Sequence, residues 1–294
     1  MKILLGCDVD PALHPVPVEG GTADIWAPLE QIPELVGRLG TDLPRITWLI
    51  RSDDSVRGAS GDFASGYLAR RDMWERLRAD GHELGWHMHT LTWRRGRGLV
   101  LDPEPDWLEA AHEALARHFD VAATRTGWDY GSNFLFAALE RLGVRIDFSA
   151  LPGNRVWVEV GQQRLVVDWI GCPEGAYRPG SEDYRRTDGR PLDLVEVPVT
   201  QFPHTLGGRL KRLVWRMGHG CFRFAGLGNK TRLMTDPWGS LPARRSDVWA
   251  FYFHPEDLRG AGMGHFIENL VRLRTLSDVE FVTASEWLET FCSS

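Results

Sequence analysis

Short apolar runs alternate with longer amphipathic segments along most of the chain, and this alternation restricts the possible folds more than any other sequence feature. Runs typical of buried strands occupy residues 2–10, 45–54, 82–89, 121–130, 144–149, 192–200 and 247–254. Helical spacing of apolar residues occurs at 27–40, 66–81, 104–119 and 132–143, and a helix–strand–helix pattern ends the chain. Repeated strand–helix units predict a parallel sheet covered by helices. Because no glycine-rich dinucleotide fingerprint is present, we expect a (β/α) barrel rather than a Rossmann fold.

Two segments interrupt the alternation. Residues 155–170 (RVWVEVGQQRLVVDWI) are typical of a β-hairpin, and a loop rich in proline and glycine follows them. Residues 90–103 have no clear strand or helix pattern, and we expect a loop there. The sequence therefore predicts a barrel with one inserted β-hairpin.

Composition narrows the class of protein. The chain has 294 residues, of which 43% are hydrophobic, and this is enough for one large barrel. The net charge of −6 argues against a general nucleic-acid-binding protein. The 4 cysteines are scattered without a C-x-x-C pair, so neither a zinc knuckle nor a disulfide framework is predicted. The first apolar run is too short for a signal peptide and no run approaches the ~18 residues of a membrane span, so we expect a cytoplasmic protein.

One stretch departs from the acidic character of the chain. No acidic residue occurs between Val197 and Thr235, whereas cations interleave with Leu, Val, Trp and Phe in residues 209–224 (RLKRLVWRMGHGCFRF). Such a stretch is suited to binding a phosphate group or an anionic membrane surface. A solvated helix face is the alternative interpretation.

Histidines are concentrated in the segment HELGWHMH, which holds His82, His87 and His89. His82 and His87 are five positions apart, so the segment is not the helical zinc motif H-E-x-x-H. His87 and His89 are two positions apart, and such residues of a strand project from the same face. Asp8 and Asp10 have the same spacing at the end of the first strand. Because barrels place their chemistry at the carboxyl ends of strands, a carboxylate and these two imidazoles predict a three-ligand metal site with open positions.

Four blocks of the sequence resemble, in order, the motifs of the polysaccharide deacetylases, the NodB-homology group. They are LLGCDVDP, DGHELGWHMH, TRTGWDY with ALERLGVRIDFS, and FYFHPEDL. The resemblance covers about residues 1–150 and 190–290. It implies one domain, residues 1–294, folded as a distorted (β/α) barrel of about seven strands that hydrolyses an N-acyl or O-acyl group on a sugar with a metal. Family members with an aspartate-x-aspartate first motif include deformylases and deacetylases of lipid-linked or cell-wall sugars, and enzymes that open cyclic amides.

Carried over residue by residue, the resemblance implies that Asp8 is the general base and that Asp10 and His87 are metal ligands. The second histidine ligand of the family lies four residues after the first, where this sequence has Leu91, which cannot bind a metal. We expect His89 to take its place, because it shares a strand face with His87. The predicted cofactor is a divalent ion, which we expect to be zinc, with iron, cobalt, nickel and manganese as alternatives.

The later blocks imply further roles. Arg125 is expected to hold Asp8 by a bidentate pair and keep it ionised, with a structural ion pair as the alternative. His254 is expected to protonate the leaving amine, and Asp168 is a candidate to orient it. His82 is expected to be structural, held by a backbone partner.

The predicted substrate-binding residues are Trp128, Asp129, Trp169 and Tyr177. The three aromatic rings could form a wall on which a sugar stacks, and core packing is the alternative. The function we expect is removal of an acetyl or formyl group from a sugar, sugar-lipid or sugar-nucleotide. Two alternatives stay open: a catalytically inactive barrel that binds carbohydrate, motivated by Leu91, and a hydrolase of a non-sugar amide.

Overall fold

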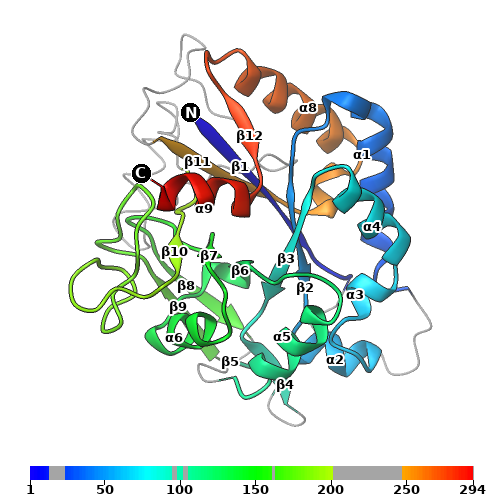
Figure 1. Cartoon of the computed structure of the whole chain (residues 1–294). Coiled ribbons are helices and arrows are strands. Elements are labelled where there is room, and N and C mark those ends of the chain that lie inside the picture. Colours follow the sequence, from blue (N-terminus) through cyan, green and yellow to red (C-terminus); the bar gives the residue numbers. More distant parts are fainter. Residues whose placement is uncertain (13–23, 95–97, 102–104, 161–162, 201–246, 294) are drawn as a thin grey trace.

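The core of the structure is one parallel sheet that curls around itself (Figure 1). The structure is a computed structural model and describes residues 1–12, 24–94, 98–101, 105–160, 163–200 and 247–293. The strands of this sheet are β1 (Lys2–Val9), β2 (Thr47–Arg51), β3 (Glu83–Met88), β6 (Ala123–Thr126), β7 (Ile146–Asp147), β10 (Val195–Glu196), β11 (Val248–Phe253) and β12 (Glu280–Val282). Their order is β10-β7-β6-β3-β2-β1-β11, and β12 pairs with the amino half of β1. Seven parallel strands along this path, with helices outside them, form the distorted (β/α) barrel that the sequence predicts.

Residues just beyond β10 bridge the two ends of this path. Val199 forms a parallel bridge with Ala250 in β11. The Thr200 N–H donates to the Ala250 carbonyl at 2.9 Å, and the Ala250 N–H donates to Thr200 Oγ1 at 2.9 Å. The strands are parallel, so their carboxyl ends face the same end of the barrel.

Helices pack on the outer side of the sheet, with α1, α4 and α8 along one flank in Figure 1. The helices are α1 (Gln31–Leu39), α2 (Asp54–Ser60), α3 (Ser65–Leu68), α4 (Arg71–Ala79), α5 (Leu108–Ala116), α6 (Asn133–Arg141), α8 (Ala261–Arg274) and α9 (Ala284–Cys292). Short 3-10 turns are η1 (Ala27–Glu30), η2 (Gly40–Asp42), η3 (Gly127–Asp129) and η4 (Pro255–Leu258). Burial of large side chains fixes the helices on the sheet: Trp48 of β2 and Trp74 of α4 are fully buried with ring centroids 6.2 Å apart.

Among the described residues, two antiparallel hairpins lie outside the barrel sheet. The first pairs β4 (Leu91–Arg94) with β5 (Gly98–Leu101), and the second pairs β8 (Arg155–Val160) with β9 (Gln163–Asp168). The second is the inserted hairpin expected from the sequence, whereas the first lies in a segment where a loop was expected. They follow β3 and β7, and β5 contacts β9. Both insertions therefore start from the carboxyl end of the barrel.

Two further sequence predictions concern the basic stretch and membrane-spanning segments. The basic stretch 209–224 lies outside the described residues, so its predicted contact with a phosphate or a membrane surface stays a prediction. Among the helices of the described residues, none combines the length and the apolar character needed to cross a bilayer.

Candidate metal centre and active site

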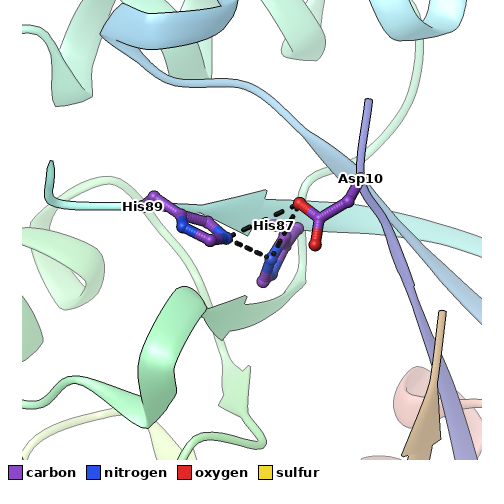
Figure 2. Close-up of side chains that lie close together, drawn as sticks. All are labelled: Asp10, His87 and His89. Carbon is purple, nitrogen blue, oxygen red and sulfur yellow. Dashed lines mark hydrogen bonds and ion pairs between the residues drawn. The ribbon is translucent and has the colours of Figure 1, made fainter. Parts of the chain in front are cut away.

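Three donor atoms meet at the carboxyl ends of β1 and β3 (Figure 2). Asp10 Oδ1 lies 3.5 Å from His87 Nε2 and 3.5 Å from His89 Nε2. The two Nε2 atoms are 3.0 Å apart. Ligands at about 2.0–2.1 Å from a tetrahedral zinc ion are separated by about 3.3 Å. The three side chains could therefore hold a metal ion with little rearrangement.

The tautomer of His87 suits this role. Its Nδ1 lies 2.7 Å from the Arg125 carbonyl oxygen, which can only accept, so Nδ1 carries the proton and Nε2 keeps its lone pair. Burial lowers the pKa of His87 well below its ordinary value, and the neighbouring His89 and Arg125 lower it further. Burial, followed by the charge of Arg51, also lowers the pKa of His89. These pKa shifts favour the neutral form of both imidazoles, which is the form that binds a metal.

Asp10 follows the last residue of β1 and is ionised. Its N–H donates to the Asp8 carbonyl at 3.0 Å, which curls the chain end toward the histidines. Burial alone would raise the pKa of Asp10, but His87, His89 and Arg51 hold it well below the ordinary range. Arg51 donates from Nη1 to Asp10 Oδ1 at 3.1 Å, the same oxygen that faces the two imidazoles.

His89 lies one residue past the end of β3, so the sheet does not hold its backbone. Its N–H instead donates to Asp53 Oδ2 at 3.1 Å. Gly127 leaves room for its ring, because a Cβ there would lie 2.2 Å from His89 Cδ2. His82 is at the opposite end of β3, where its Nδ1 accepts the Ile46 N–H at 3.1 Å. The expected backbone partner of His82 is confirmed, and it supports a structural role.

Asp8 is completely buried beside the donor triangle. Arg125 Nη1 donates to its Oδ2, whereas Asp8 Oδ1 accepts no hydrogen bond from any described residue. Burial raises the pKa of Asp8 to about 6, although Arg125 and His254 act to lower it. Arg125 acts in the expected direction, since its charge favours the ionised form of Asp8, but desolvation exceeds this attraction and leaves the pKa above the ordinary value.

Arg125 joins two carboxylates rather than making the predicted bidentate pair with Asp8. Its second terminal nitrogen, Nη2, donates to Asp129 Oδ1. Its guanidinium carbon lies 3.6 Å from the centroid of the Tyr252 ring, which presses the guanidinium plane against a buried aromatic face. Asp129, predicted to bind substrate, is thus held in an ion pair at the edge of the site.

His254 follows the last residue of β11 and faces both aspartates. Its Nε2 lies 3.7 Å from Asp8 Oδ2 and 3.7 Å from Asp10 Oδ2. Burial alone would lower its pKa, but the hydrogen bond to Asp257 and the charges of Asp8 and Asp10 raise it to about 9. The orienting carboxylate is Asp257, 3.1 Å from His254 Nδ1, and not the expected Asp168, which pairs with arginines elsewhere.

The predicted substrate-binding aromatic residues divide into two groups. Trp128 is 50% exposed, and its ring stands edge-on to His89 with centroids 6.2 Å apart. It holds a left-handed φ of 61°, and Asp129 one of 52°, conformations that cost about 1–3 kcal/mol each and occur mainly at functional sites. Trp169 is 0% exposed and Tyr177 5%, so the predicted stacking of sugar on these two is wrong; they belong to the core.

Three residues around the donors received no role from the sequence: Arg51, Asp53 and Asp257. Arg51 and Asp53 form the pattern R-x-D at the end of β2, the position where a barrel carries functional side chains. Asp257 is three residues after His254, and its Oδ2 also accepts the His254 N–H at 3.0 Å, as in a helix cap. Position in the fold and cap spacing were the signals that could have found them.

Comparison with solved structures identifies the type of fold. No family model and no curated protein matches the chain. A solved structure from Mycobacterium smegmatis, described as a polysaccharide deacetylase, aligns over 99% of this chain and 90% of its own, with 13% identity and a TM-score of 0.54. An allantoinase structure aligns over 100% of this chain and 90% of its own, with 11% identity and a TM-score of 0.53. The chain therefore has the NodB-type fold that these deacetylase and allantoinase structures share.

Proposed function

We propose that this protein is a metal-dependent hydrolase that removes an acetyl or formyl group from the amine of a carbohydrate. The observation that carries the proposal is the triangle of Asp10 Oδ1, His87 Nε2 and His89 Nε2, with sides of 3.5, 3.5 and 3.0 Å. A buried carboxyl group, Asp8, and a third imidazole, His254, adjoin it. A donor set of two imidazoles and one carboxylate suits zinc best, with iron, cobalt, nickel and manganese as alternatives.

Asp8 is suited to act as the general base. When bound, the divalent ion supplies Lewis-acid chemistry, polarising an acyl carbonyl and making water more acidic. Asp8 Oδ2 is fixed by Arg125, and Oδ1 accepts no hydrogen bond from a described residue. That oxygen can take the proton of the attacking water as the water oxygen bonds to the acyl carbon.

His254 is suited to act as the general acid. Asp257 holds Nδ1 at 3.1 Å, so the acidic proton is on Nε2, on the side of Asp8 and Asp10. As the C–N bond breaks, His254 Nε2 gives its proton to the departing nitrogen, which leaves as an amine. The acyl group leaves as a carboxylate, and one water is consumed.

The edge of the site supports a carbohydrate as the proposed substrate. The half-exposed indole of Trp128 beside His89 offers a flat apolar face of the kind that sugar rings stack on. Asp129 adjoins it and can accept from sugar hydroxyl groups. We extend the proposal to sugars linked to a phosphate or lipid phosphate because of the cations in residues 209–224.

Metal content and substrate preference test the proposal together. Purified protein should contain close to one divalent ion per chain by elemental analysis, and should lose it on His87→Ala substitution. The metal-loaded protein should release acetate or formate from N-acyl glucosamine oligosaccharides. A protein that takes up no metal would instead be a carbohydrate-binding barrel without catalysis. Turnover of a cyclic amide such as allantoin, with none of the sugars, would favour the non-sugar amide hydrolase, an alternative supported by the fold shared with an allantoinase.

A further inference from the structure

A single buried carboxylate, Asp53, connects the ends of three elements around the metal donors. It lies two residues after the end of β2 and is 0% exposed. Its Oδ1 accepts the Val56 N–H at 3.0 Å, which caps the amino end of α2. Its Oδ2 accepts both the His89 N–H at 3.1 Å and Arg51 Nε at 2.7 Å.

The hydrogen bond from the His89 N–H to Asp53 holds the His89 backbone, which lies beyond the end of the sheet. Where β2 and β3 end, the Ser52 N–H donates to the His87 carbonyl at 2.9 Å. β3 ends at Met88, one residue before His89. Beyond that point Asp53 accepts the next backbone N–H. The position of His89 relative to His87 therefore depends on the side chain of Asp53, between β2 and α2, rather than on strand pairing alone.

Through its contact with Arg51, the Asp53 carboxylate also acts on a second metal donor, Asp10. Arg51 is held at Nε by Asp53 and donates from Nη1 to Asp10 Oδ1 at 3.1 Å. That oxygen is the one that faces both imidazoles. Asp53 thus acts on Asp10 through the guanidinium group and on His89 through the backbone.

We propose that Asp53 is the positioning residue of the metal centre, fixing two of its three donors. This inference rests on the metal site of the proposed function and adds a residue to it. It also explains how a histidine at position 89 can serve where Leu91 cannot. An outer partner that orients ligands in this way typically changes metal affinity by about 10- to 100-fold when it is removed.

Binding of Zn²⁺ and Co²⁺ to the metal-free full chain tests the inference. In Asp53→Ser the hydroxyl can still cap α2, but it cannot serve Arg51 and His89 together. In Asp53→Asn the shape is kept, while the amide carries N–H groups that cannot accept. Both variants should weaken Zn²⁺ binding by about 10- to 100-fold in competition titrations. Their Co²⁺ complexes should lose intensity in the visible d–d bands, as expected when a donor moves out of tetrahedral geometry.

A matched control separates positioning from helix capping. Thr283 caps α9, where its side chain accepts the Glu286 N–H, and it lies at the amino end of the barrel near Thr47. Thr283→Ala should lower the melting temperature yet leave the Zn²⁺ affinity and the Co²⁺ spectrum unchanged. Affinity in both Asp53 variants within about twofold of the wild type would overturn the inference and leave the proposed function intact. A wild-type chain that binds neither ion would overturn both.

A double-mutant cycle divides the effect between the two donors. In a His89→Ala background, Asp53→Ser can act only through Arg51 and Asp10, so its effect on Zn²⁺ affinity should shrink but persist. An undiminished effect in that background would overturn the part of the inference that concerns His89.

Discussion

Two carboxyl groups two positions apart, Asp8 and Asp10, have pKa values displaced in opposite directions. Burial raises the pKa of Asp8 to about 6, whereas neighbouring imidazoles and Arg51 overcome burial and lower that of Asp10. Asp10 also faces both histidine Nε2 atoms, and Asp8 does not. Environments that separate two such groups commonly separate their chemical roles. The pair is therefore suited to one ligand and one base.

We predict that Asp8→Asn keeps the metal and loses activity. The amide cannot take a proton from water, so kcat should fall by about 10²–10⁴, the usual contribution of a general base. The metal content, measured by elemental analysis, should stay at the wild-type level because Asp10, His87 and His89 are unchanged. Loss of metal together with activity would mean that Asp8 is itself a ligand, and the two aspartates would exchange roles.

We predict that His254→Ala and Asp257→Asn change substrate selectivity in the same direction. An amide needs its leaving nitrogen protonated, whereas an aryl ester has a leaving group that departs unaided. Both variants should therefore slow an N-acetyl sugar more than an aryl acetate, with the larger effect in His254→Ala. Comparison of kcat/KM for the two substrates gives the result. Equal slowing of both substrates would assign His254 to binding or structure.

The sequence predicted the members of the site better than their partners. Spacing of two on a strand sufficed to group His87 with His89 and to exclude His82, because strand geometry is local. The pairing of His254 with Asp257 rather than Asp168 depends on how η4 turns after β11, which no local pattern specifies. Burial of Trp169 depends on packing from distant elements, so its exposure could not be predicted from adjacency to the motifs.

At the scale of elements, β3 serves different purposes at its two ends. At its amino end, His82 accepts the Ile46 N–H, and Glu83 accepts from Thr47 Oγ1 and from Ser285. These contacts join the starts of β2, β3 and α9. At its carboxyl end the strand presents His87 to the candidate metal site. One end stabilises the barrel, and the other is suited to the chemistry.

We predict that the amino end of β3 makes stability depend on pH through His82. Burial lowers the pKa of His82, so the folded state favours the neutral ring that accepts from Ile46. A lowered histidine pKa gives stability that is fully present above the unfolded value of about 6.5 and declines as pH falls below it. The folding constant should fall by at most about tenfold per pH unit from this group, the limit for one proton.

Denaturant unfolding of the wild type and His82→Gln between pH 7.5 and 5 measures this effect. Glutamine can accept the same N–H but does not titrate, so the variant should show a shallower loss of stability with acid. Parallel curves for the two proteins would mean that other groups carry the acid sensitivity of the fold.

Elements with strong local patterns were predicted, and those created by tertiary contacts were not. The hairpin β8–β9 follows from its dense β-branched residues, and β1, β2 and β11 follow from long apolar runs. The hairpin β4–β5 was missed, since residues 90–103 have no uninterrupted apolar alternation. The predicted helix 66–81 is two helices, because Arg70 leaves helical geometry at φ −140°. β7 and β10 have only 2 residues each, so pairing with neighbours defines them more than their sequence.

At the scale of the whole molecule, the barrel depends on a short contact between its first and last strands in space. β10 and β11 are the ends of the strand order, and the chain beyond β10 joins them through Val199, Thr200 and Ala250. Ala250 is 2% exposed, so its N–H has little access to water if Thr200 Oγ1 is removed. His254 directly follows this strand, four residues after Ala250. Closure of the barrel and placement of His254, the proposed general acid, are therefore linked through β11.

We predict that Thr200→Val destabilises the protein, whereas Thr200→Ser has a small effect. Valine has nearly the shape of threonine but cannot accept the Ala250 N–H, and leaving a buried donor without a partner costs about 1–3 kcal/mol. Serine keeps the hydroxyl and loses one methyl group, so the hydrogen bond at 2.9 Å can persist. Denaturant unfolding at one pH should place the valine variant below both other proteins by about that amount. Because His254 directly follows β11, the valine variant should lower kcat more for an N-acetyl sugar than for an aryl acetate. If the valine and serine variants unfold at the same denaturant concentration, the Thr200 hydroxyl does not hold the chain beyond β10 against β11. The backbone hydrogen bond from Thr200 N to the Ala250 carbonyl then suffices to close the barrel.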